Sequence, residues 1–182
     1  MKKVVYILFV ILAVGCKNDN KENKNPEVTE EKVAIDKFFS VTLDVVAKKD
    51  DSFHVFYTED GTVDFNEKNS VWCEFKGSDG SQKLVFNLPK DVSPTHLRID
   101  FGLNKEQSEV KINNLILSYF ENETNISGID FFKYFSPNIE NTIVDVNTQT
   151  IKPLIKNTTQ DSGCGSVYPT EALVLELQKI TN

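Results

Sequence analysis

Arginine is nearly absent from this chain of 182 residues, in which Arg98 is the one arginine. The chain holds 20 basic and 27 acidic residues, so its formal net charge is −7. Binding to nucleic acid relies on clustered Lys and Arg side chains that neutralise phosphates. The sequence has no such cluster, and nucleic acid is therefore not an expected partner.

Motifs that carry catalytic chemistry are also missing. The sequence has no Gly-x-Ser-x-Gly, no His-Glu-x-x-His, no glycine-rich phosphate loop and no Cys-x-x-Cys. His54 and His96 lie in separate segments without further ligands at a zinc-binding spacing. The acidic turns at Asp50–Asp51 and Asp79–Gly80 lack the full oxygen set that Ca²⁺ requires. We therefore expect no enzymatic activity, no cofactor and no bound metal.

Long apolar runs are confined to one place, Val4–Val14. Lys2 and Lys3 precede this run, and Gly15 and a polar segment follow it. The run is too short to cross a hydrocarbon layer of about 30 Å, which takes about 20 apolar residues. A basic start, an apolar middle and a small-residue end are typical of a signal peptide. We predict that residues 1–15 are removed as one.

The end of this segment, Ala13-Val14-Gly15-Cys16, resembles the lipobox of bacterial lipoproteins, with Leu12 one position earlier than the usual leucine. The resemblance implies that Cys16 carries a diacylglyceryl group and that the new amino terminus is acylated too. Several acyl chains together anchor a protein stably in a membrane. The alternative is an ordinary secretory signal with Cys16 merely nearby.

The segment 16–31 consists mostly of Lys, Asn, Asp and Glu and cannot form a core, so we expect a disordered tether. Its start is similar in composition to the export signals of Bacteroidetes-type surface lipoproteins. Together these features predict a lipid-anchored protein of the cell envelope. The expected location is the outer membrane, on its periplasmic or its surface face.

Only Cys73 and Cys164 remain once Cys16 is assigned to lipid. Disulfides persist outside the cytoplasm, so these two cysteines are candidates for a bridge. The alternative is a buried thiol at Cys73 and a loop thiol at Cys164.

Beyond the tether, apolar and polar residues alternate with a period of two, which is the pattern of half-buried strands. Six strands are expected, at Phe39–Val45, Phe53–Tyr57, Val71–Phe75, Leu84–Leu88, Leu97–Phe101 and Val110–Tyr119. The alternation shifts at Asn113–Asn114, which indicates a β-bulge, and Gly77–Gly80 is a hairpin signal. These strands predict one mainly β domain at 32–182, an antiparallel two-sheet β-sandwich of jelly-roll-like type.

After Phe120 the alternation weakens. Ile129–Phe135, here called the Phe-rich segment, suits a short helix or a cover segment laid on the sandwich. Thr142–Val146 and Thr150–Ile155 are candidates for closing strands. The tail at 170–180 fits a strand or a helix, and the preceding proline together with good helix formers favours a short C-terminal helix.

Three stretches, Lys83–Pro89, Leu97–Gly102 and Val110–Leu117, resemble a bacterial jelly-roll pattern found in domains similar to carbohydrate-binding modules. The resemblance covers about half of the chain, from Phe38 to Phe120. It implies a jelly-roll fold and an accessory role in glycan binding. A fold hosts many functions, so the ligand does not follow from it.

Strand parity provides the candidate site. If the alternating apolar residues face the core, then Trp72, Arg98 and Asp100 face outward. An exposed indole is a flat platform for a sugar ring, and Arg and Asp supply hydrogen bonds for hydroxyl groups. The alternative is that the Phe-rich segment packs over Trp72 and that Arg98 and Asp100 form a structural ion pair.

Two functions remain open at this point. The first is a non-catalytic, glycan-binding accessory lipoprotein. The second is a structural or assembly lipoprotein that binds another envelope protein through the Phe-rich segment.

Overall fold

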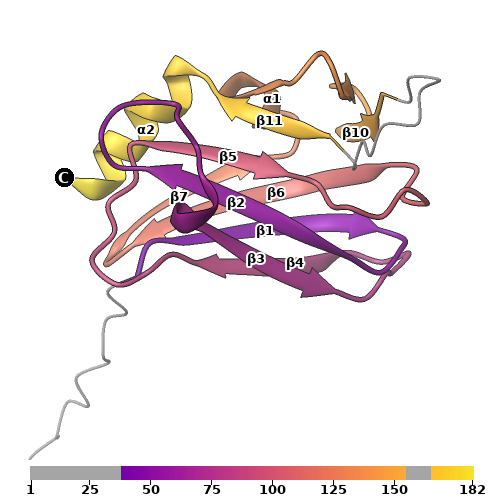
Figure 1. Ribbon diagram of the computed structural model, residues 1–182, viewed down its shortest axis with the longest axis horizontal. Helices are drawn as coiled ribbons and strands as arrows, with labels where there is room; N and C mark the ends of the chain where they lie inside the picture. The colour runs from indigo at the N-terminus through magenta and orange to yellow at the C-terminus, as the bar shows by residue number, and fades with distance from the viewer. Residues whose placement is uncertain (1–37, 155–164) are drawn as a thin grey trace, which may run out of the picture. The chain divides into compact units, whose positions relative to one another are not determined.

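A computed structural model describes residues 38–154 and 165–182, which fold into two antiparallel sheets, two α-helices and a 3₁₀ turn (Figure 1). Sheet A contains, in spatial order, β4 (Gln82–Asn87), β1 (Ser40–Ala47), β6 (Val110–Tyr119), β10 (Thr150–Pro153) and β9 (Thr142–Asp145), with β7 (Asn122–Ser127) also paired to β6. Sheet B contains β3 (Ser70–Phe75), β2 (Asp51–Thr58), β5 (His96–Asp100), β11 (Ser166–Pro169) and β8 (Phe135–Pro137). The remaining elements are η1 (Glu67–Asn69), α1 (Phe131–Tyr134) and α2 (Glu171–Thr181).

The core lies between the two sheets and is built from alternate residues of their strands. Val41, Leu43 and Val45 of β1 are fully buried, while the residues between them are half-buried. The same alternation holds in β4 and β5. Because successive side chains of a strand point to opposite faces, a period of two produces one apolar and one polar face. The predicted two-sheet β-sandwich is confirmed.

The predicted β-bulge in β6 is also confirmed. Asp44 pairs with Asn114 while Val45 pairs with Ile112, so Asn113 has no opposite residue in β1. The side-chain Nδ2 of Asn113 instead donates to Asp44 Oδ1 at 3.0 Å. The extra residue lets the apolar residues on both sides of the bulge reach the same core.

The hairpin predicted at Gly77–Gly80 is wrong. β3 belongs to sheet B and β4 to sheet A, so this turn crosses from one sheet to the other. It runs beside the connection of β1 to β2, where the Ser78 amide donates to the Ala47 carbonyl at 2.8 Å. A Cβ atom at Gly77 would lie 2.4 Å from the Lys48 carbonyl oxygen, so this close approach requires glycine.

The C-terminal third forms the expected short helix in the Phe-rich segment, the strands β9 and β10, and the C-terminal helix. In α2 the residues Leu173, Leu177 and Ile180 are buried, which is the helical spacing seen in the sequence. β7, β8 and β11 were not predicted. Neither α-helix of the described residues is long and apolar enough to cross a membrane.

The cysteines divide between described and undescribed parts of the chain. Cys73 is half-buried, packs against the core from β3, and burial raises the pKa of its thiol. Cys16 and Cys164 lie outside the described residues. Lipidation of Cys16 and a bridge between Cys73 and Cys164 therefore stay predictions.

Candidate functional site

The outer face of sheet B brings together the three residues selected by strand parity. Trp72 lies on β3 and is 45% exposed, whereas Arg98 and Asp100 lie on β5. The strand between them is β2, on which His54 is paired with Trp72 on one side and with Asp100 on the other. The three residues thus lie on one face of one sheet, as the parity argument required.

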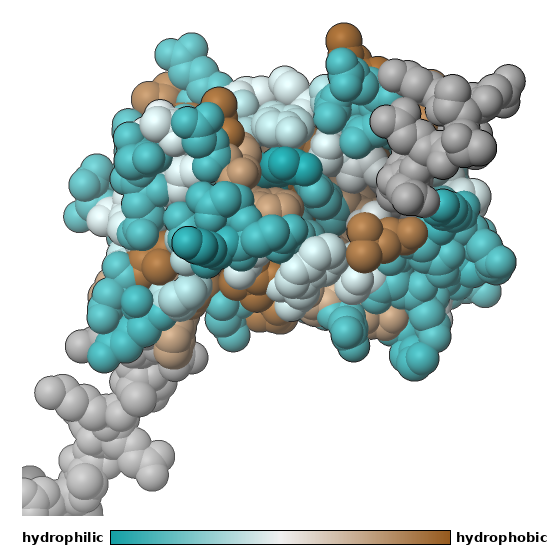
Figure 2. Space-filling model, viewed as in Figure 1, coloured by the Kyte–Doolittle hydropathy of each residue, from teal (hydrophilic) through white to brown (hydrophobic). Residues whose placement is uncertain are grey.

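Two ring–ring contacts and two contacts of a guanidinium group with a ring link side chains of this face into a continuous row. The Trp72 and His54 rings are stacked with centroids 3.7 Å apart, and His54 and Phe56 are 3.8 Å apart. The Arg98 guanidinium carbon lies 4.8 Å from the Phe56 centroid and 5.1 Å from that of Tyr168. This aromatic row, Trp72–His54–Phe56–Arg98–Tyr168, crosses from β3 to β11. Figure 2 views this side of the molecule and shows a mixed surface, on which hydrophobic (brown) and intermediate (white) residues lie among hydrophilic (teal) ones.

A loop at residues 59–69, between β2 and β3, covers the middle of the aromatic row. In Figure 1 it stands in front of β2. The Phe65 ring lies 6.1 Å from that of Tyr168, and Glu67 Oε2 lies 3.7 Å from His54 Nε2. His54 and Phe56 point outward from the sheet yet are only 2% and 6% exposed. The loop therefore leaves Trp72 as the open end of the row.

The base of the 59–69 loop is fixed by hydrogen bonds. The Thr58 hydroxyl donates to the Thr62 carbonyl at 2.6 Å, and the Gly61 amide donates to the Thr95 hydroxyl at 3.1 Å. Gly61 has a φ of +79°, a conformation in which glycine is favoured. In the sequence, Glu59-Asp60-Gly61 indicates only a turn at the end of the Phe53–Tyr57 strand. The signal for a longer covering loop is the apolar run Val55–Tyr57, which has no polar face.

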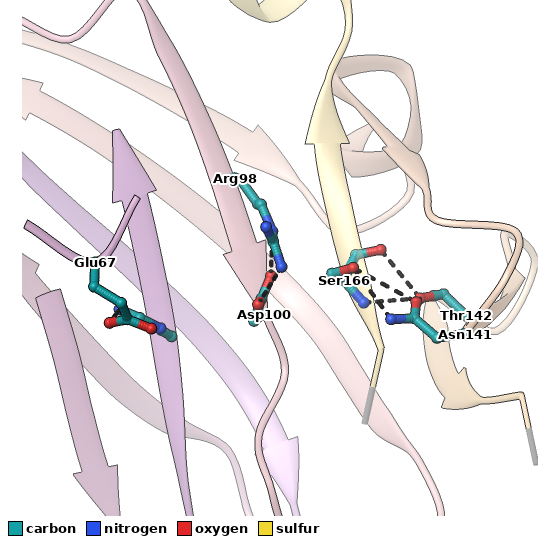
Figure 3. A network of polar contacts seen from close by, with 7 residues as sticks. Glu67, Arg98, Asp100, Asn141, Thr142 and Ser166 are labelled. Carbon is teal, nitrogen blue, oxygen red and sulfur yellow. Dashed lines mark hydrogen bonds and ion pairs between the residues drawn. The ribbon is translucent and has the colours of Figure 1, made fainter. Parts of the chain in front are cut away.

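Arg98 and Asp100 form a bidentate ion pair on this face (Figure 3). Arg98 Nε donates to Asp100 Oδ1 at 2.8 Å, and a terminal nitrogen donates to Oδ2 at 2.7 Å. Burial raises the pKa of Asp100, the two bonds from Arg98 oppose this shift, and the charge of Glu67 adds to it. Arg98 and Asp100 thus form the ion pair that the alternative interpretation expected. Both side chains remain about one quarter exposed, at 25% and 27%.

A second set of polar side chains, Asn141, Thr142 and Ser166, lies next to Asp100, because Ser166 of β11 pairs with Asp100 of β5 (Figure 3). The Ser166 amide donates to the Thr142 hydroxyl at 2.8 Å, and that hydroxyl is 2.6 Å from Asn141 Oδ1. A Cβ atom at Gly165 would lie 2.6 Å from the Thr142 hydroxyl oxygen, so glycine leaves room for this side chain. The group ties β11 to β9 and fixes the edge of the face.

The Phe-rich segment does not take part in this face. Its Phe131 ring lies 6.4 Å from that of Phe101, and both Phe131 and Phe135 are fully buried. The alternative in which this segment packs over Trp72 is wrong, because Phe131 and Phe135 lie in the core and the ring stacked on Trp72 is that of His54. Apolar residues in sequence order do not reveal which part of the sandwich they cover.

The acidic turn residues considered for Ca²⁺ are engaged within the protein. Asp50 accepts from the Lys76 ammonium at 2.6 Å and from the Gly77 amide at 2.8 Å, and these bonds lower its pKa. Asp51 Oδ1 accepts from the backbone amides of residues 52, 103 and 104. These carboxylates hold the connections at one end of the sandwich. Among the described residues no cluster of potential metal ligands was found.

The arrangement suits binding more than catalysis. Both oxygens of Asp100 accept hydrogen bonds from Arg98, and the 3.7 Å between His54 and Glu67 is too long for a hydrogen bond. In residues 38–154 and 165–182, the side chains of this face do not form a hydrogen-bonded set of nucleophile, base and orienting group. What the face offers a ligand is an exposed indole beside groups that form hydrogen bonds.

The shifted pKa of His54 makes the free energy of unfolding depend on pH. Burial lowers its pKa, the nearby Arg98 lowers it further, and Glu67 partly offsets this, so the folded protein favours the neutral ring. The neutral His54 ring contributes its full stabilisation at a pH above 6.5, the ordinary pKa of histidine. This contribution is lost as the pH falls from 6.5 through the lower pKa of the folded state. We expect urea unfolding to show a larger loss of stability between about pH 7.5 and about pH 5.5 in the wild type than in His54→Phe. Equal losses in the two proteins would contradict this role.

A scan of protein-family models and searches of curated proteins and of solved structures found no match to this chain.

Proposed function

We propose that this protein is a lipid-anchored protein of the cell envelope that binds a glycan, without catalysis, on the outer face of sheet B. The observation that carries the glycan proposal is the placement of an exposed Trp72 on the same face as the Arg98–Asp100 pair. The anchor is inferred from the Ala13–Cys16 pattern at the end of the apolar N-terminal run.

The chemistry of this face matches that of a sugar chain. A sugar ring has an apolar C–H face and a rim of hydroxyl groups, and the Trp72 indole is a flat apolar surface of similar size. The carboxylate of Glu67 accepts hydrogen bonds from hydroxyls, the Arg98 guanidinium donates them, and the Tyr168 hydroxyl does both. One stacking platform with nearby donors and acceptors is sufficient for glycan recognition without a deep pocket.

The second function, a structural or assembly protein that binds another envelope protein, is favoured by a different surface. β9 lies at the end of sheet A in the described part of the chain. In and beside it, Ile139, Ile143 and Val146 are 82%, 47% and 45% exposed. A sheet edge with exposed apolar residues is a common site for association. On this reading β9, and not the buried Phe-rich segment, contacts the partner.

The glycan proposal predicts a selective effect of Trp72→Ala. Thermal denaturation against a panel of polysaccharides should identify one that raises the melting temperature of the wild type, because a ligand that binds the native state stabilises it. Trp72→Ala should lose this shift. Its own melting temperature should stay within a few degrees of the wild type, since the ring is nearly half exposed.

Phe120→Ala is the matched control, because Phe120 is an aromatic residue of similar exposure, 47%, that follows β6 in sheet A. It should retain the full shift. A shift retained in Trp72→Ala, or lost equally in both variants, would remove the support for this face as the binding site.

A further inference from the structure

The charges of the 59–69 loop distinguish it from the sheet that it covers. It carries four acidic residues and one basic residue, which gives a formal charge of −3: Glu59, Asp60, Asp64, Glu67 and Lys68. On the sheet, Arg98 is matched by Asp100 in the bidentate pair. The cationic member of the aromatic row is thus paired within the face, whereas the loop over the row has a negative net charge.

Glu67 extends this negative charge to the row itself. Its side chain is 75% exposed and reaches to 3.7 Å from His54, so it lies between the solvent and the buried ring. Its charge also raises the pKa of Asp100, which places both carboxylates in one electrostatic environment. Glu67 therefore presents more of its charge to solvent than Arg98 does, since the Arg98 side chain is only 25% exposed.

We propose that the ligand of this face is an uncharged glycan chain, and not an acidic one. This inference rests on the proposed glycan-binding function and specifies its ligand class. Hydroxyl groups donate to the carboxylates of the 59–69 loop, whereas uronate or sulfate groups are repelled by them. Burying an additional unpaired anion beside Glu67 and Asp100 is unfavourable, because the cation on the sheet is already paired.

The test is affinity electrophoresis of the full-length protein in gels that contain one polysaccharide each. The neutral probes are laminarin, mannan and xylan, and the acidic probes are alginate, polygalacturonate and chondroitin sulfate. The wild type should be retarded by at least one neutral probe and by none of the acidic ones. Trp72→Ala should lose the retardation.

Two variants of Glu67 separate charge from hydrogen bonding. Glu67→Gln keeps an acceptor and should retain affinity for the neutral probe. Glu67→Lys should raise affinity for the acidic probes by on the order of tenfold at low salt, and this gain should disappear at high salt.

Different outcomes would overturn the uncharged ligand class and glycan binding itself. Retardation by an acidic probe that depends on Trp72 would overturn the uncharged class and leave glycan binding intact. Mobility unchanged by every probe, for the wild type and for Glu67→Lys, would overturn glycan binding itself.

Discussion

Replacing Phe53 with alanine is expected to lower the free energy of unfolding by about 3–5 kcal/mol. Phe53 is fully buried on the inner face of β2. Its ring makes edge-to-face contacts with Phe75 at 4.7 Å and with Phe101 at 5.3 Å. Truncation removes the apolar contacts and leaves a cavity that three strands of sheet B cannot easily close, so the loss exceeds that of an ordinary surface change.

Urea unfolding followed by circular dichroism measures this effect. Phe120→Ala again serves as the control, because its ring is 47% exposed, and its loss should be well below that of Phe53→Ala. A loss under about 1 kcal/mol for Phe53→Ala would mean that the packing between the sheets is not as described.

Replacing Cys16 with serine is expected to move the protein from the membrane fraction to the soluble fraction. The reason is that acyl chains on Cys16, and not the protein surface, provide the proposed attachment, and serine has no thiol to carry them. Fractionation of cells followed by immunoblotting measures the distribution. Mass spectrometry of the wild type should find an acylated amino terminus at Cys16.

Cys73→Ser is the matched control, because it removes a thiol of β3 that has no part in the anchor. It should remain in the membrane fraction. If Cys16→Ser also remained there, attachment by lipid at this position would be rejected.

Much of the fold was predictable, because each sheet has one apolar face. Phe39–Val45 and Leu97–Phe101 alternate cleanly, and a shift of one residue would expose a whole set of apolar side chains. The same parity placed Trp72 and Arg98 on the outside. That they share a sheet could not be read from parity, since the alternation is the same in every strand.

The parts that were missed depend on contacts between distant segments. Gly77–Gly80 indicates a reversal of the chain, but the sheet that the next strand joins depends on long-range packing. β8 and β11 have three and four residues, too short for a period to be recognised. The 59–69 loop is polar and resembles an ordinary surface loop, although Phe65 and Glu67 contact the face beneath it.

The double coverage of β2 has a consequence for dynamics. This strand has a hydrogen-bonded neighbour on each side, the core on its inner face and the 59–69 loop over its outer face. Amide protons in such a strand exchange with solvent mainly through global unfolding, whereas those of the edge strand β3 exchange through local opening. His54, the ring on which Trp72 stacks, is therefore held in place before any ligand arrives. Association on this face would lose little conformational entropy in the protein, so even a shallow surface can achieve useful affinity.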